Sequence, residues 1–79
     1  FPNPFNPTTT IKFDIAKSTF VNIKIFDVLG REIYSLVNEE LNAGSYTVNW
    51  DATDFSGGIY FYRISAGNYT ETKKMILAK

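Results

Sequence analysis

The stretch Ser56-Gly-Gly-Ile-Tyr-Phe-Tyr-Arg-Ile-Ser65 decides the fold of this chain. Its two glycines favour a turn, and the aromatic and β-branched residues after them are typical of a β-strand. No other part of the chain is apolar for as long, so we expect Ile59–Ser65 to be the central strand of a small β domain. We expect Tyr60, Tyr62 and Ile64 to point into its core.

Outside this stretch, apolar and polar residues alternate in several short segments, the pattern of half-buried strands. The pattern of Glu32–Val37 is irregular, since Ile33, Tyr34, Leu36 and Val37 are all apolar, and it would fit a strand that is covered on both faces. The further expected strands are Thr9–Ile15, Phe20–Asp27, Glu32–Val37, Gly44–Asp51 and Tyr69–Leu77. We expect Asp27–Arg31 to be a hairpin turn with positive φ at Gly30, and Asn38–Ala43 to be a loop or a single helical turn. This spacing predicts an all-β fold, an immunoglobulin-like antiparallel β-sandwich of about seven strands.

A small-Gly-x-Tyr pattern occurs at Ala43–Tyr46, Gly57–Tyr60 and Ala66–Tyr69. Its unequal spacing excludes a solenoid repeat. We interpret it as a device for entering a strand, in which the glycine frees the backbone and the tyrosine ring anchors the strand. Tyr60, which follows Asp54 and two glycines, resembles the tyrosine corner of immunoglobulin-like sandwiches.

Size and charge limit the possible functions. The chain has 79 residues, 44% of them hydrophobic and 16% aromatic, which indicates one globular domain with a small core. Eight basic and eight acidic residues give a net charge of zero, which argues against binding to nucleic acid or to an anionic membrane. No apolar run is long enough to span a bilayer, so we expect no membrane insertion. The chain begins without Met or a signal-peptide pattern, and we expect it to be a segment of a longer protein.

The residues offer little catalytic chemistry. Cysteine and histidine are absent, so the chain has no Cys-His or Ser-His-Asp nucleophile and no ordinary zinc site. Asp51 and Asp54 lie where Asx turns are expected, which we favour over a catalytic role; calcium binding in this loop stays an alternative. We expect Glu39 and Glu40 to lie in a solvated loop. We therefore predict no enzymatic activity and no cofactor.

Two groups of side chains could bind a partner. Core packing explains most of the aromatic residues, but Phe26, Tyr34 and Phe61 could lie off the buried faces and stack on a sugar. The C-terminal segment is basic and apolar, and its charges could simply protect an edge strand. A partner could also recognise it through the edge backbone and the lysines. The candidate recognition residues are Lys73, Lys74, Met75, Ile76, Leu77 and Lys79.

Several motifs follow one another along the whole chain in a distinctive order. They are Pro2-Asn3-Pro4-Phe5-Asn6-Pro7-Thr8, Thr9-Thr10-Ile11, Asp27-Val28-Leu29-Gly30-Arg31-Glu32, Ala43-Gly44-Ser45-Tyr46, Trp50-Asp51-Ala52, Ser56-Gly57-Gly58-Ile59-Tyr60-Phe61-Tyr62-Arg63 and Lys73-Lys74-Met75-Ile76-Leu77-Ala78-Lys79. Each motif alone is weak, but the ordered set resembles the C-terminal sorting domain, type A, of the type IX secretion system. The motif residues with expected structural roles are Pro2, Asn3, Pro4, Phe5, Asn6, Pro7, Gly30, Arg31, Gly44, Tyr46, Trp50, Gly57, Gly58 and Tyr60.

The resemblance implies a function that composition does not show. Such domains are immunoglobulin-like sandwiches that direct a cargo protein across the outer membrane of a Gram-negative bacterium and are removed by a cell-surface peptidase. The implied partners are the type IX export machinery, that peptidase and an upstream cargo domain in the same chain. Residues 1–79 would then be a single sorting domain, with 1–8 an extended Pro-rich lead-in. We expect a monomer on a protein that is secreted or displayed at the cell surface.

The basic C-terminus leads to a hypothesis about recognition. Removing Met75–Lys79 is predicted to leave a fused reporter in the periplasm. Two alternatives remain open at this point: a passive immunoglobulin-like spacer, and a carbohydrate-binding module of a secreted multidomain enzyme. A position away from the C-terminus of the parent protein would favour the spacer, and glycan binding that is lost on ring-to-Ala changes would favour the carbohydrate-binding module.

Overall fold

The computed structural model describes residues 8–78, which form six β-strands. The strands are β1 (Thr8–Ile15), β2 (Thr19–Phe26), β3 (Glu32–Leu41), β4 (Gly44–Asp51), β5 (Gly58–Ala66) and β6 (Tyr69–Leu77). Thr8, the last residue of the expected lead-in, is the first residue of β1. The expectations for residues 1–7 of the lead-in and for Lys79 lie outside the described residues. In the described part of the chain, no helix has the length and hydrophobicity needed to cross a membrane.

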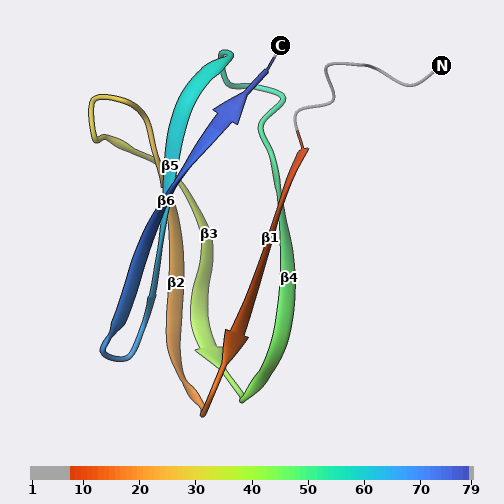
Figure 1. Cartoon of the computed structure of the whole chain (residues 1–79), viewed down its shortest axis with the longest axis vertical. Helices are drawn as coiled ribbons and strands as arrows, with labels where there is room; N and C mark the ends of the chain where they lie inside the picture. Colours follow the sequence, from red (N-terminus) through yellow and green to blue (C-terminus); the bar gives the residue numbers. More distant parts are fainter. Residues whose placement is uncertain (1–7, 79) are drawn as a thin grey trace, which may run out of the picture.

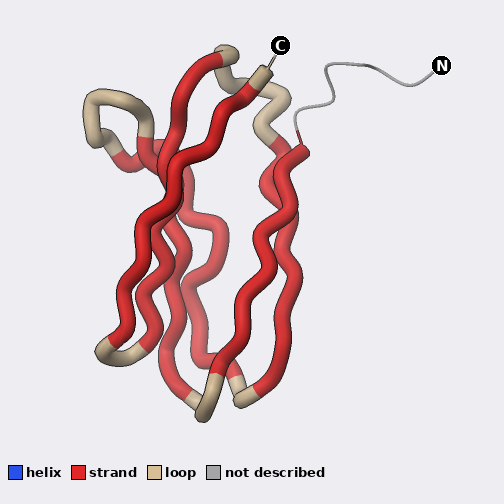
Figure 2. The backbone as a smooth tube through the Cα atoms, viewed as in Figure 1, coloured by secondary structure: helices blue, strands red, loops and turns tan. Residues whose placement is uncertain are grey.

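The six strands form two antiparallel sheets (Figure 1). β1 and β4 make a two-stranded sheet, and the other sheet has the strand order β3-β2-β5-β6. The prediction of an all-β antiparallel fold is confirmed, with six strands in residues 8–78 where about seven were expected. β5 pairs with β2 on one side and β6 on the other, so the central position expected for Ile59–Ser65 is confirmed. The tube in Figure 2 shows that short turns join most of the strands.

The core forms where the two sheets face each other. Alternation along β2 puts Val21, Ile23 and Ile25 at 0% exposure, because every second side chain points at the opposite sheet. Two groups of buried side chains fill this space. The Ile23 cluster contains Ile11, Ile15, Val21, Ile23, Val37 and Ile64, and the Trp50 cluster contains Ile25, Trp50, Ala52, Tyr60 and Leu77. Both sheets contribute to each cluster, so the sheets are held together by a continuous apolar layer.

β3 corrects one prediction from the sequence. The loop or helical turn expected at Asn38–Ala43 is wrong, because β3 continues to Leu41 and pairs with β2 as far as Thr19. Glu39 and Glu40 are therefore exposed residues of an edge strand, where charged side chains protect against pairing with other chains.

The irregular spacing of apolar residues in β3 also has a structural cause. The pairing of β2 with β3 shifts register between Ile23 and Lys24, so that Ile23 faces Val37 while Lys24 faces Ser35. The extra residue, Leu36, bulges, and both Leu36 and Val37 contact the core. Two consecutive apolar residues can therefore both be covered without a second layer on the outer face.

Candidate recognition site

The C-terminal strand β6 is an edge strand. It pairs with β5 from Tyr69 to Leu77, and within residues 8–78 no other strand pairs with its free side. An edge strand offers unpaired N–H and C=O groups, to which a partner can add a strand. The register with β5 decides which face of the sheet each β6 side chain occupies.

The core-side residues of β6 include two apolar anchors. Leu77 is 7% exposed and belongs to the Trp50 cluster, and Met75 packs against that cluster. Of the predicted recognition residues, these two are therefore mainly structural, since a partner could reach them only by opening the sandwich.

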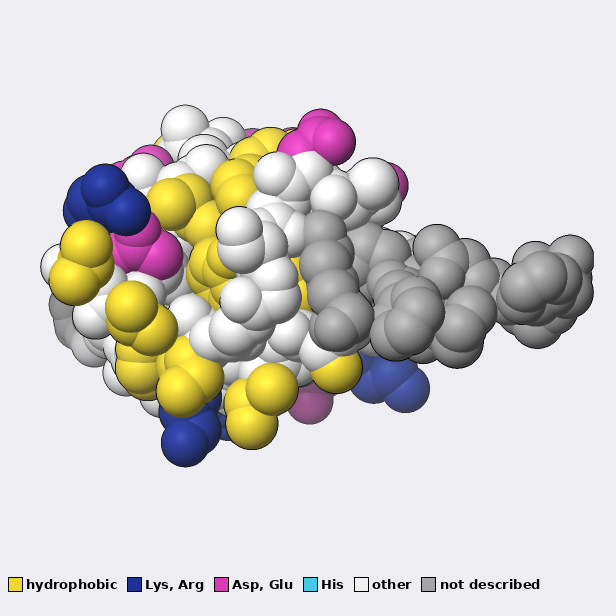
Figure 3. Space-filling view, turned by 90° about the horizontal axis from the view of Figure 1, so that it is seen from above, with side chains coloured by type: hydrophobic (Ala, Val, Ile, Leu, Met, Phe, Trp, Pro, Cys, Tyr) yellow, Lys and Arg dark blue, Asp and Glu magenta, His cyan; other side chains and the backbone are white. Residues whose placement is uncertain are grey.

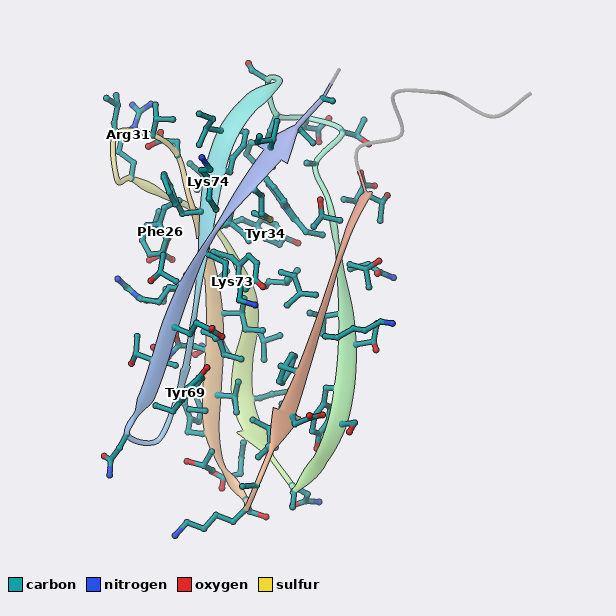
Figure 4. All side chains as sticks on the ribbon, viewed as in Figure 1. Phe26, Arg31, Tyr34, Tyr69, Lys73 and Lys74 are labelled. Carbon is teal, nitrogen blue, oxygen red and sulfur yellow. The ribbon has the colours of Figure 1, made fainter. Side chains whose placement is uncertain are left out.

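The outer face of β6 is different in character. Lys74 lies opposite Phe61 and Ile76 lies opposite Ile59, and both β6 side chains are exposed, Ile76 at 72%. Lys73 lies opposite Tyr62 and is exposed at the edge, but its side chain starts on the other face of the sheet from that of Lys74. The structure thus separates the two adjacent lysines, which both come from β6 (Figure 4). Lys79, the third lysine of the predicted cluster, lies outside the described residues.

In two of the three small-Gly-x-Tyr motifs, the tyrosine hydroxyl donates a hydrogen bond to the backbone just before a strand. The Tyr60 hydroxyl donates a hydrogen bond to the Ser56 carbonyl oxygen at 2.7 Å, and the Tyr46 hydroxyl donates one to the Asn42 carbonyl oxygen at 2.6 Å. Gly44 and Gly58, two residues before each tyrosine, have φ of 153° and 144°, which non-glycine residues rarely adopt. These two occurrences confirm the strand-entry interpretation.

The third occurrence of the motif differs. Tyr69 donates its hydroxyl hydrogen bond to the Glu71 carboxylate at 2.8 Å instead of to the backbone. This bond raises the pKa of the Tyr69 phenol above its ordinary value, and desolvation adds to the effect. Gly67, two residues before Tyr69, has φ of 60° and lies in the short hairpin turn between β5 and β6. The residue four positions before Tyr69 is Ser65, which belongs to β5 and pairs with β6 instead of lying in a loop.

Trp50 connects the motifs to the core. It is 1% exposed, and its ring meets the Tyr60 ring edge-on at 5.6 Å and the Phe55 ring at 5.4 Å. Tyr46 stacks on Phe13 at 5.4 Å across the two-stranded sheet. Aromatic pairs at these distances add packing energy beyond the buried area. The structural roles of Tyr46, Trp50 and Tyr60 are therefore visible as specific contacts.

The turn between β2 and β3 is held by Asp27. Its Oδ1 accepts hydrogen bonds from the N–H groups of Leu29 at 2.9 Å and Arg31 at 3.0 Å, and its Oδ2 accepts one from Arg31 Nε at 2.7 Å. The Arg31 N–H is the main reason that the pKa of the Asp27 carboxyl lies below its ordinary value; the guanidinium of the same residue and the Leu29 N–H also lower it. Gly30 has φ of 81°, as predicted for this turn. The turn therefore has a fixed shape.

This turn also carries residues that we did not predict to be functional. Val28 and Leu29 are 62% and 74% exposed at its tip. Ile59 and Ile76, on neighbouring strands at the same end of the sheet, are 41% and 72% exposed. Two apolar residues inside a turn are unusual, and this was the feature in the sequence that could have drawn attention to them.

The three rings considered for a sugar platform do not lie together. Phe26 and Phe61 are opposite each other on the outer face, and the Arg63 guanidinium lies 4.7 Å from the centre of the Phe26 ring. Tyr34 is opposite Ile25, on the core side of edge strand β3 (Figure 4). A flat platform needs its rings on one surface, so this arrangement does not favour carbohydrate stacking.

The acidic loop after β4 forms the predicted turn. Asp51 Oδ1 accepts hydrogen bonds from the N–H of Thr53 at 3.0 Å and from the Thr53 hydroxyl, which confirms an Asx turn. Among residues 8–78, no group of three or more acidic side chains is arranged to hold a metal ion.

Comparison with known proteins adds one finding. A family model described as "Secretion system C-terminal sorting domain" matches residues 1–78, nearly the whole chain. No curated protein and no solved structure matches the chain.

Proposed function

Because the chain belongs to the family of C-terminal sorting domains of the type IX secretion system, we propose that the export machinery recognises it through the C-terminal strand β6. Membership makes the domain a non-catalytic sorting module that interacts with this machinery. Its cargo is secreted across the outer membrane of a Gram-negative bacterium. The assignment decides against the passive spacer and the carbohydrate-binding module.

The observation that carries the proposal is that one face of β6 packs on the core while the other face is exposed. Met75 and Leu77 fix the strand to the core, while Lys74 and Ile76 extend outward and Lys73 extends from the edge. A partner that pairs with the free edge would meet the lysines and the exposed isoleucine without disturbing the core. The strand is thus both firmly placed and accessible.

The finer steps of sorting belong to the same proposal. Residues 1–79 act as a single domain, and the Pro-rich segment 1–8 links it to an upstream cargo domain. A cell-surface peptidase removes the domain, and the cargo is released or displayed. The domain works as a monomer. The Tyr60–Ser56 hydrogen bond supports an immunoglobulin-like sandwich, since a tyrosine corner of this kind is a mark of that fold.

The structure changes how this proposal is tested. Deletion of Met75–Lys79 removes Leu77 and Met75 from the Trp50 cluster, so loss of export could come from unfolding alone. Substitution of Lys74→Glu with Ile76→Ser changes only exposed side chains. The full 79-residue domain is fused to a reporter in a type IX-competent host, and the fraction of reporter at the surface is measured.

The proposal expects the double variant to hold the reporter in the periplasm while the purified domain melts like the unsubstituted domain. The matched control is Lys12→Glu with Phe20→Ser, one exposed lysine of β1 and one exposed apolar residue of β2. Normal surface display by the folded double variant would contradict recognition through β6.

A further inference from the structure

Exposed apolar side chains gather at one end of the four-stranded sheet. Of the seven large hydrophobic side chains exposed in residues 8–78, four lie where β2 ends, β5 begins and β6 ends. We call this set the end patch: Val28, Leu29, Ile59 and Ile76. Figure 3, which views the molecule from this end, shows hydrophobic side chains grouped together beside basic ones.

The members of the end patch are neighbours in space. Ile59 and Ile76 face each other across β5 and β6. Val28 and Leu29 line a shallow hollow of about 290 Å³ together with Gly57–Tyr60, which joins the turn to the start of β5. The space beside Gly58 is open, because a Cβ added there would meet no atom within 4 Å.

The fixed shape of the β2–β3 turn makes this exposure significant. The three hydrogen bonds to the Asp27 carboxylate support the turn backbone that carries Val28 and Leu29 into solvent. A surface that is ordered before binding loses less conformational entropy when a partner arrives. Grouped apolar side chains on the surface of a small domain mark an interaction site more often than scattered single ones.

A basic side chain that has no acidic partner in the described part of the chain, Lys74, borders the end patch. Nearby acids are already paired, Asp27 with Arg31 at 2.7 Å and Glu32 with Lys24 at 3.3 Å. Lys74, two residues before Ile76 on the same outer face, has no acidic side chain of residues 8–78 at ion-pair distance. A complementary surface would therefore be apolar at its centre and carry carboxylates at its rim.

We propose that the end patch is a second part of the recognition surface, bound by a protein of the export machinery through an apolar hollow bordered by carboxylates. The inference rests on the proposed function, because Ile76 and Lys74 belong to both surfaces. It goes further in one respect. The turn residues are far from the C-terminus in sequence, so the recognised feature exists only when β2, β5 and β6 have assembled.

The test uses residues of the patch that are remote from β6. Val28→Ser with Leu29→Ser is placed in the 79-residue reporter fusion, with Phe20→Ser as the control for loss of an exposed apolar side chain and Leu29→Met as the conservative variant. Export by the turn variant should fall about tenfold or more, the factor that loss of one buried leucine-sized contact produces. Both controls should export like the unsubstituted fusion.

The outcomes separate the two proposals. Failure of the unsubstituted fusion to reach the surface would overturn sorting by these 79 residues. Normal export by Val28→Ser/Leu29→Ser, with the unsubstituted fusion exporting well, would overturn the end patch alone. If the turn variant melts at lower temperature, Ile59→Thr, which keeps β propensity, tests the same patch: reduced export supports the proposal, and unchanged export contradicts it.

Two other possible ligands of the end patch, a second copy of the domain and a lipid surface, would give different experimental results. The purified domain is examined by sedimentation, and by flotation with vesicles of phosphatidylcholine and phosphatidylglycerol. A monomer that does not float supports a protein partner in the export machinery. Self-association or vesicle binding that disappears in the Val28→Ser/Leu29→Ser variant would assign the patch to a second copy or to lipid, and would overturn the proposal.

Discussion

The Tyr60 hydroxyl lies 2.7 Å from the carbonyl oxygen of Ser56, to which it donates a hydrogen bond across the entrance to the inner strand β5. The same four-residue spacing joins Tyr46 to Asn42 at the entrance to β4. Each sheet thus has one strand whose start is fixed by a tyrosine that reaches back to the preceding loop. The net stability of so small a domain is low, so the loss of one such contact removes a large fraction of it.

We expect Tyr60→Phe to lower the free energy of unfolding by about 1 kcal/mol, the usual net value of one hydrogen bond. Tyr60→Ala should cost about 3 kcal/mol or more, because it also removes a buried ring from the Trp50 cluster. Tyr46→Phe should cost less than Tyr60→Phe, since the Tyr46 bond is exposed to water. Urea unfolding followed by Trp50 fluorescence measures all three, and equal losses for both Phe variants would contradict the ranking.

A second prediction compares Gly57 with Gly58, the first residue of β5. Gly58→Ala should destabilise the domain by about 1–3 kcal/mol through backbone strain alone, because its φ is 144° and the added Cβ meets open space. Gly57 has no positive φ, so Gly57→Ala should be close to neutral. Thermal unfolding of the two variants compares them, and a similar melting temperature for both would show that the strain is absent.

Adjacent residues of β6 should respond in opposite ways. Leu77→Ala leaves a cavity in the Trp50 cluster and should cost about 2–5 kcal/mol. Ile76→Ala changes a residue that is 72% exposed, and should alter stability by no more than about 0.5 kcal/mol. Denaturant unfolding of the pair tests the register of β6 against β5, since a strand shifted by one residue would reverse the two results.

The Asp27 carboxyl makes the stability of the folded domain depend on pH in the acidic range. Its pKa in the folded domain lies below the ordinary value of 3.8, so the charged form contributes stability above that value, and this contribution is lost as pH falls through the folded pKa. Asp27→Asn keeps an acceptor oxygen but loses the charge, so its melting temperature should fall less steeply below about pH 4. Melting curves between about pH 6 and pH 2 test this, and parallel slopes in the two proteins would contradict it.

The alternation of single strands was readable from the sequence because it depends only on neighbouring residues. Val21, Ile23 and Ile25 point inward as their spacing predicts, and β5 is an inner strand because it is apolar on both sides. The extension of β3 to Leu41 was not readable, because an exposed edge strand tolerates the polar residues that also mark loops. A bulge further hid its pattern.

The candidate site was only half predictable. The C-terminal segment was identified from its lysines, yet strand alternation places Lys73 and Lys74 on opposite faces and turns Leu77 into the core. The end patch depends on the β2–β3 turn meeting the neighbouring strands, which is a tertiary arrangement. The sequence predicts Asp27–Arg31 only as a hairpin turn, and no local pattern shows that its exposed Leu29 lies at the same end of the sheet as Ile59 and Ile76.

The most direct test of recognition through β6 is the surface fraction of a reporter that carries the Lys74→Glu/Ile76→Ser domain in a type IX-competent host. The purified variant must first melt like the unsubstituted domain, as the exposure of both side chains leads us to expect. We predict that the reporter stays in the periplasm, while the Lys12→Glu/Phe20→Ser control reaches the surface. Surface display of the folded β6 variant at the level of the control would contradict the account.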